Sequence, residues 1–360
     1  MLTTLIIFII ILGVLVFVHE FGHFYTARKL GVKSDEFGFG FPPRICGWKK
    51  INGKRKFFWG NGEVKSEDTI YSLNWIPIGG FVKIKGEDGE DKSDKDSFAN
   101  QKIWKRTAIL SAGVTMNVVL CMVLLMFAFG LGAPQVIDDT NQATKVTDEK
   151  IQILSILNET PAAEAGLVMG DVIVSLNDQT FSEVEDVITY LADYEGQNVT
   201  VNISRLGEAK TFEIAPVILE QTGKSGFGVA LAKTGIVSYP WYQAIWLGIK
   251  GTFLMFIQII VAFYTVIKNA IIHQPIGVDV AGPVGIAVLT GQVARMGLVY
   301  LLQFAALLSL NLAIINFLPL PALDGGRVLF LIIEKIRGKA VNEKVEQVVH
   351  TVGFMLLMVL

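Results

Sequence analysis

Long apolar runs separated by polar segments are the most regular pattern in this chain. Three runs have the length of a membrane-spanning helix, at about 2–25, 107–133 and 297–320. A fourth begins near Val345, but its strongly apolar part covers only 352–360, which is shorter than the ~20 residues needed to cross a bilayer. The pattern predicts a multi-pass α-helical membrane protein with four spans, the last one truncated in this sequence.

A further apolar segment, 241–272, is long enough to cross a membrane but contains more polar residues. Trp241, Lys250, Gln258 and Lys268 interrupt it. Helices with one polar and one apolar face lie in the plane of the membrane interface. We therefore predict an interfacial amphipathic helix here, with spanning as the alternative.

Two polar segments have the patterns of folded, non-spanning structure. Residues 31–106 alternate apolar, glycine and charged residues, which predicts a membrane-associated β region followed by a charged loop. Residues 140–220 contain strand-like runs between turn residues and helix-like stretches at 161–166 and 182–193, which predicts an α+β module. The predicted parts are therefore 1–30, 31–106, 107–133, 140–220, 236–296, 297–326 and 345–360.

Composition supports this mixture of spans and polar parts. The chain has 52% hydrophobic and 18% charged residues, with a mean hydropathy of +0.50. It is too apolar for an ordinary soluble protein and too charged for a pure bundle of spans. The net charge of −2 gives no sign of a nucleic-acid partner. Cys121 lies in an apolar run, so we expect no disulfide with Cys46, the other cysteine.

The distribution of charge predicts the orientation in the membrane. Lys and Arg concentrate in 31–106 and again from Arg327 to Lys344, so both segments are expected to be cytoplasmic. Asp138 and Asp139 open the connection after the second span, which places the α+β module on the extracytoplasmic side. An odd number of crossings must then separate Ala133 from Arg327. The third span alone satisfies this if 241–272 lies in the interface.

The first span ends in a metal-binding pattern, His19-Glu20-Phe21-Gly22-His23. Two histidines four residues apart lie on one face of a helix, where both can bind one zinc ion. The glutamate between them can act as general base on a water molecule. Ionisable residues in the continuation of a membrane helix are costly and therefore usually functional.

The third zinc ligand is expected from another part of the chain, because catalytic zinc usually has three protein ligands. Asp324 follows the third span directly and precedes two glycines. At 1.5 Å per residue, His19 lies roughly 27 Å along a helix that enters from outside. The third span runs in the same direction, so both spans carry their polar residues to the cytoplasmic side. A turn residue is the alternative role for Asp324.

Asn316 and two prolines, Pro319 and Pro321, interrupt the end of the third span. The prolines break the helix and free backbone groups, which is tolerated where they line a cavity or meet protein. Asn316 is suited to donate to a substrate carbonyl or a developing oxyanion. An interhelical hydrogen bond is an equally good interpretation of this residue.

These residues together resemble the site-2 protease family of intramembrane zinc metalloproteases, in the bacterial branch that includes the regulator of sigma-E protease. The matching elements are the His19–His23 motif, the N-x-x-P-x-P-x-L-D-G block from Asn316, and shorter blocks at 38–40 and 78–83. The resemblance covers essentially the whole chain. It implies that His19, His23 and Asp324 bind Zn²⁺ and that Glu20 is the catalytic base. The predicted substrate-binding residues are Asn316, Pro321, Gly38, Gly40, Gly79 and Gly80.

The resemblance also gives roles to the two polar parts. The β region would hold an unwound substrate as an added strand. Residues 165–173 resemble the signature of bacterial PDZ domains, so the α+β module is expected to be one extracytoplasmic PDZ domain. It would either capture a C-terminus or exclude substrates with large external domains, and we slightly favour exclusion.

The resulting hypothesis is a zinc-dependent intramembrane endopeptidase in the bacterial cytoplasmic membrane. It would cleave transmembrane segments of single-pass proteins or peptides, such as an anti-sigma factor or remnant signal peptides, with its active site towards the cytoplasm. Its other expected partner is the lipid bilayer, and its oligomeric state is left open. Two alternatives are a membrane-anchored metalloprotease acting on soluble substrates and a non-catalytic zinc-binding PDZ scaffold.

Overall fold

The computed structural model describes the chain except for residues 1, 52–53, 63–67, 88, 90, 92, 138–144, 158, 206, 220–224, 273–281, 340, 342 and 360. The prediction based on Asp138 and Asp139 therefore lies outside the described residues. Two compact units make up the fold: 1–125 with 248–294 and 301–360, and 126–247 with 295–300. We call the first the helical unit and the second the insert unit.

Helices dominate the helical unit. They are α1 (Leu2–Lys29), α2 (Ile103–Leu131), α5 (Trp241–Ile271), α6 (Pro283–Met296), α7 (Leu298–Phe317), α8 (Asp324–Arg337) and α9 (Glu343–Val359); α2 and α5 continue into the insert unit. Among the described residues, α1, α2, α5 and α7 are long and apolar enough to cross a membrane. The structure is that of a multi-pass membrane protein.

One of the predicted helical segments differs in detail from the structure, and another forms a single helix as predicted. The predicted third span, 297–326, is a helix, a break and the start of a second helix, because α7 ends at Phe317 and α8 begins at Asp324. Pro319 and Pro321 lie in the break, where they cannot continue the backbone hydrogen bonds of α7. Segment 241–272 forms α5, one unbroken helix of 31 residues. Its position in the interface stays a prediction.

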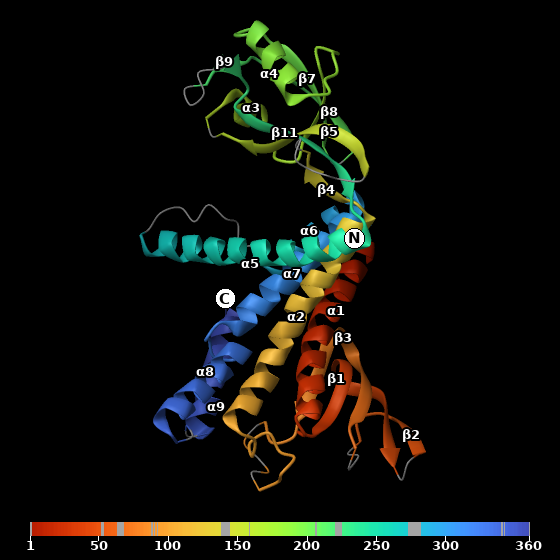
Figure 1. The fold of residues 1–360 in the computed structure, drawn as a ribbon, viewed down its shortest axis with the longest axis vertical. Helices are drawn as coiled ribbons and strands as arrows, with labels where there is room; N and C mark the ends of the chain where they lie inside the picture. The colour runs from red at the N-terminus through yellow and green to blue at the C-terminus, as the bar shows by residue number, and fades with distance from the viewer. Residues whose placement is uncertain are drawn as a thin grey trace. The chain divides into compact units, whose positions relative to one another are not determined.

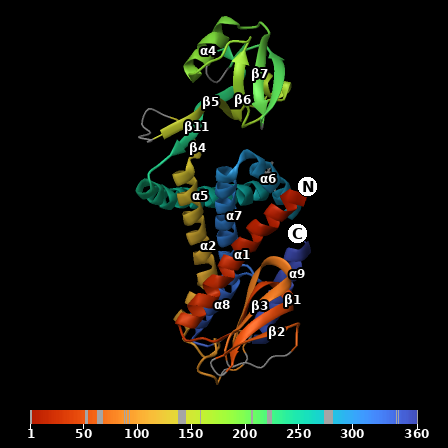
Figure 2. The same ribbon diagram turned by 90° about the vertical axis from the view of Figure 1, so that its right-hand side faces the viewer.

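Small and polar residues bring α1, α2 and α7 together (Figures 1 and 2). A Cβ on Gly22 of α1 would lie only 2.8 Å from the Ala112 carbonyl carbon of α2, so the two backbones meet at this glycine. Ser309 of α7 donates to the carbonyl of Asn117 in α2 at 2.8 Å. Close backbone approach through small residues is how helices pack without a hydrophobic driving force.

The β region of the helical unit packs on α1 (Figure 1). It contains β1 (Ser34–Ile51), β2 (Lys54–Trp59) and β3 (Ile70–Ile84), in the order β2-β1-β3. Phe39 is a register partner of both Leu73 and Gly80, so β1 pairs with two segments of β3. Gly40 and Gly79 have φ angles of 80° and 77°, which glycine adopts without steric cost. A Cβ at Gly79 would collide with Val16 of α1.

The insert unit contains a six-stranded sheet in the order β4-β11-β5-β6-β7-β8. Its strands are β4 (Ala133–Val136), β5 (Lys145–Ile156), β6 (Val172–Leu176), β7 (Val199–Arg205), β8 (Glu208–Ile214) and β11 (Val229–Ser238), with a separate pair formed by β9 (Val217–Ile218) and β10 (Ser225–Gly226). Helices α3 (Pro161–Ala165) and α4 (Val184–Asp193) complete it. The sheet extends beyond the predicted 140–220 on both sides, because β4 and β11 belong to it.

A buried apolar cluster holds the insert unit together. Ile153, Leu176, Val187, Val201 and Phe227, each at most 1% exposed, belong to it. Val187 comes from α4, whereas Ile153, Leu176 and Val201 come from strands β5, β6 and β7. The helix therefore covers the apolar face of the sheet. This is the α+β arrangement that the strand and helix patterns predicted for the segment.

Candidate active site

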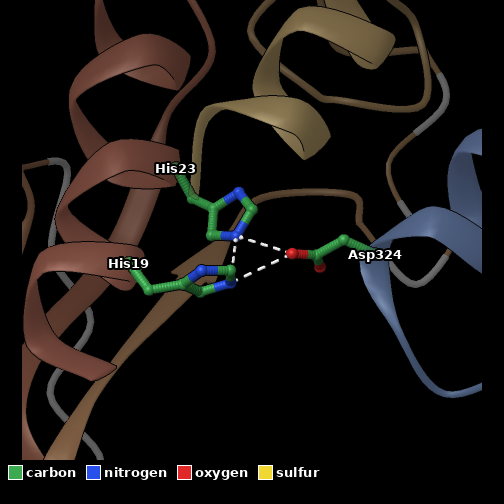
Figure 3. A group of neighbouring side chains, drawn as sticks. All are labelled: His19, His23 and Asp324. Atoms are coloured by element: carbon green, nitrogen blue, oxygen red, sulfur yellow. Dashed lines mark hydrogen bonds and ion pairs between the residues drawn. The ribbon is translucent and has the colours of Figure 1, made fainter. Parts of the chain in front are cut away.

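Three side chains from two distant segments converge in the helical unit (Figure 3). His19 and His23 lie one turn apart on α1 and are each 6% exposed. Oδ2 of Asp324, the first residue of α8, lies 3.0 Å from Nε2 of His19 and 3.3 Å from Nε2 of His23. The two Nε2 atoms are 3.1 Å apart. One ligand atom from each residue lies within 4.8 Å of the others.

The outer ring nitrogens explain why both Nε2 atoms face the centre. Nδ1 of His23 lies 2.8 Å from the carbonyl oxygen of Ile109, to which it can only donate. Nδ1 of His19 lies 3.4 Å from the side-chain amide of Asn117. Asn117 Oδ1 is buried and without a hydrogen-bond partner in the described part of the chain. Exchanging its amide oxygen and nitrogen, which is a matter of assignment, lets Oδ1 accept from His19 Nδ1–H.

This arrangement fits a metal ion. With both protons on Nδ1, two imidazole lone pairs and a carboxylate oxygen point at one place. Oδ2 of Asp324 is buried and, among the described residues, has no hydrogen-bond partner. Three acceptors brought this close repel one another unless a cation lies between them. Two imidazoles and one carboxylate are the ligand set of catalytic zinc sites that keep a fourth position open.

Gly113 of α2 makes room for the two imidazoles, a role that the sequence analysis missed. A Cβ at this position would lie 2.7 and 2.8 Å from Cε1 and Nε2 of His19 and would collide with Nε2 of His23. Asn117, also missed as a site residue, lies one turn further along α2. A glycine and an asparagine four residues apart in an apolar span are the signal that could have found them, because both occupy one helix face.

Glu20 and Asn316 line the same cavity as two of the three convergent residues, His19 and Asp324. The cavity has a volume of about 210 Å³ and is lined by Val16, His19, Glu20, Leu312, Asn316, Ala322, Leu323 and Asp324. Oε2 of Glu20 accepts a hydrogen bond from the backbone N–H of Val82 in β3 at 3.2 Å. The Glu20 carboxylate and the Asn316 amide therefore line the same cavity as His19 and Asp324. A general base, a hydrogen-bond donor and metal ligands are groups that metal-dependent hydrolysis uses.

The other predicted substrate-binding residues do not line this cavity. Gly38 is enclosed in the β region, where a Cβ would lie 2.7 Å from Nδ2 of Asn74, and the carbonyl of Gly40 accepts from the same amide at 2.8 Å. A Cβ on Gly80 would lie 2.9 Å from the carbonyl oxygen of Gly38. The close packing of these glycines, and of Gly79 on α1, has a structural reason of its own. Their contact with substrate stays a prediction, as does that of Pro321.

The apolar helices and the two-histidine, one-carboxylate cluster define the class of the protein: a membrane protein with a site suited to catalytic zinc. Comparison with known proteins gives the family. The model of peptidase family M50 matches residues 7–360, so the chain belongs to this family, that of the site-2 proteases. M50 enzymes depend on zinc, and the protein is a zinc metalloprotease. The resemblance seen in the sequence motifs is thereby confirmed.

Individual relatives match along nearly their full lengths. A putative zinc metalloprotease of Clostridium perfringens is 33% identical over 96% of this chain and 92% of its own length. The regulator of sigma-W protease RasP of Bacillus subtilis is 28% identical over 99% and 96%. A PDZ domain of the SdrC-like protein of Listeria monocytogenes is 25% identical, covering 24% of this chain and 93% of its own, with a TM-score of 0.22. That score is too low to support an argument about the fold.

Proposed function

We propose that this protein is an intramembrane endopeptidase whose zinc ion is bound by His19, His23 and Asp324. The observation that carries the proposal is the shared cavity, in which His19 and Asp324 meet Glu20 and Asn316, with His23 beside them at 3.3 Å from Oδ2 of Asp324. Both histidines belong to α1, a candidate span of high hydropathy, and Asn316 belongs to α7, another candidate span. Peptide bonds that reach this cavity would therefore come from membrane segments.

Each residue has a chemical task in this proposal. Zinc, when bound, supplies a Lewis acid that lowers the pKa of water and polarises a carbonyl oxygen. Glu20 takes the proton of the attacking water and returns it to the leaving amine. The amide of Asn316 donates to the carbonyl oxygen as negative charge develops on it. Val82 N–H holds the Glu20 carboxylate towards the cavity.

Two variants with opposite expected effects on zinc test these roles. Glu20→Gln should keep one zinc per chain and lose cleavage by a factor of about 10² to 10⁴, the usual contribution of a general base. Asp324→Asn should lose both zinc and cleavage. Glu164→Gln, on an exposed position of the insert unit, is the matched control. Retained cleavage by Glu20→Gln would exclude this mechanism and favour a non-catalytic scaffold.

The substrate class is tested by comparing two reporters. One carries a single transmembrane segment, and the other carries the same residues next to a soluble carrier protein. The proposal expects cleavage of the first, because α1 and α7, two candidate membrane spans, contribute residues to the cavity. Preferential cleavage of the soluble reporter would instead support a membrane-anchored protease of ordinary substrates.

We further propose the orientation that the charge distribution predicts, with the active site towards the cytoplasm and the insert unit as an extracytoplasmic PDZ domain. Met169 offers a test because its side chain is 74% exposed. In a Met169→Cys variant, a membrane-impermeant maleimide added to intact bacterial protoplasts should label the new thiol. Labelling only after lysis would indicate the opposite orientation, with the insert unit on the cytoplasmic side.

A further inference from the structure

The position of Asp324 depends on a short break between two helices. Residues 318–323 connect α7 to α8, and Ala322 and Leu323 of this break line the active-site cavity. Ala322 has a φ angle of 72°, in the left-handed region that residues with a Cβ avoid. Such a conformation is strained and persists only when neighbouring structure holds it. The break therefore needs contacts from outside itself.

Helix α9 supplies these contacts through two residues on one face. Nδ1 of His350 accepts a hydrogen bond from the backbone N–H of Ala322 at 2.8 Å. One turn later, Gly353 is buried against Pro321: a Cβ there would lie 3.0 and 3.1 Å from the proline's carbonyl carbon and Cα, and would collide with its ring. The hydrogen bond and the close approach hold two successive residues of the break.

The surroundings of His350 favour the tautomer that this hydrogen bond requires. An imidazole accepts through Nδ1 only when its proton is on Nε2. Nε2 of His350 has no hydrogen-bond partner among the described residues, and Oε1 of Glu346, one turn earlier on α9, lies 4.0 Å away, which favours a proton on Nε2 electrostatically without a hydrogen bond. The other flank of the ring packs on Phe330 of α8, with 5.5 Å between centroids. His350 thus contacts both the break and the helix that begins with Asp324.

We propose that His350 and Gly353 are positioning residues of the metal site, acting through Pro321 and Ala322 to hold Asp324 against His19 and His23. This inference rests on the proposed ligand set. Asp324 is two residues from Ala322, and metal–ligand distances tolerate deviations of only about 0.2 Å. Relaxation of Ala322 towards an ordinary φ angle would move the carboxylate by more than that. In this proposal α9 determines part of the geometry of the active site.

The test uses four substitutions on α9, His350→Leu, His350→Asn, Gly353→Ala and Val348→Leu, in the protein purified in detergent. His350→Leu removes the acceptor. His350→Asn keeps one, because Asn Oδ1 occupies nearly the place of His Nδ1. Val348→Leu alters a side chain that is 62% exposed on the same helix and is the matched control. Zinc affinity is measured by competition with a chelator, and ligand geometry by the visible absorption of the cobalt-substituted protein.

We expect His350→Leu to weaken zinc binding 10- to 100-fold, the usual effect of losing support for a ligand, and to alter the cobalt spectrum. His350→Asn should restore most of both, and Val348→Leu should match the unmodified protein. If His350→Leu does not fold, the zinc affinities of Gly353→Ala and His350→Asn test the proposal instead. Unchanged zinc affinity and cobalt spectrum in His350→Leu or Gly353→Ala, or an Asn variant that binds zinc no better than the Leu variant, would overturn the proposal.

Asp324→Asn in the same titration separates this proposal from the one on which it rests. If Asp324→Asn binds zinc as tightly as the unmodified protein, the ligand set itself is wrong. If it loses zinc while His350→Leu keeps it, the ligand set stands and the role of α9 fails.

Discussion

Replacing Gly113 by alanine should weaken zinc binding without unfolding the protein. The new Cβ would lie 2.7 and 2.8 Å from ring atoms of His19, where ordinary contact begins at 3.4 Å. The Cβ would also collide with Nε2 of His23, so both imidazoles or the α2 backbone must move; relieving the 2.7 Å contact alone takes about 0.7 Å, beyond the ~0.2 Å that metal–ligand distances tolerate. We expect zinc affinity to fall on the order of 100-fold, the upper end of what losing ligand support costs.

The effect on stability should be smaller and separable. Overpacking a buried site costs roughly 1–3 kcal/mol, while alanine in place of glycine stabilises a helix by up to ~1 kcal/mol. Gly130→Ala is the control on the same helix, because its Cβ would meet nothing closer than Ala244 at 3.9 Å. Zinc affinity is measured by chelator competition and folding by thermal unfolding. Unaltered zinc affinity in Gly113→Ala would refute the reasoning from the two imidazoles.

Three further outcomes follow from the same contacts. Asn117→Leu removes the acceptor for His19 Nδ1–H and should lower zinc affinity 10- to 100-fold. If the variant and the unmodified protein give the same chelator titration curve, this hydrogen bond does not support zinc binding. Arg205→Met leaves the Asp171 carboxylate, 0% exposed and bound to the guanidinium at 2.8 Å, without its cation, and should destabilise the insert unit by about 3 kcal/mol. Hydrogen exchange of β5 to β8 measures this, and unchanged protection would contradict it. Removing zinc with a chelator should abolish cleavage but leave the helical circular dichroism signal unchanged. The reason is that apolar contacts hold α1 and α8 together, since Ala27, Val328 and Leu331 share one buried cluster. Loss of helicity would show that the metal itself maintains the fold.

Local patterns predicted the parts of this protein that depend on neighbouring residues. The helical spacing of His19 and His23 places both on one face in any helix, so their pairing needed no tertiary information. The apolar runs predicted α1, α2 and α7 within a few residues of their ends. The prolines after Asn316 marked the break between α7 and α8. The position of Asp324 directly after the third apolar run and before two glycines made it the candidate third ligand, and the structure does place it 3.0 Å from His19.

Tertiary packing decided the strand pairings and the contacts between distant segments. Strand β11 joins the insert sheet by pairing with β5, more than 70 residues earlier, and no local pattern records such a pairing. The spacing of Gly113 and Asn117 puts them on one face of a span, but only the approach of α2 to α1 places that face against the two imidazoles. His350 likewise gains its contact with Ala322 when α9 packs on the break. Sequence periodicity determines which face a residue occupies, whereas the neighbour that meets that face depends on how distant segments fit together.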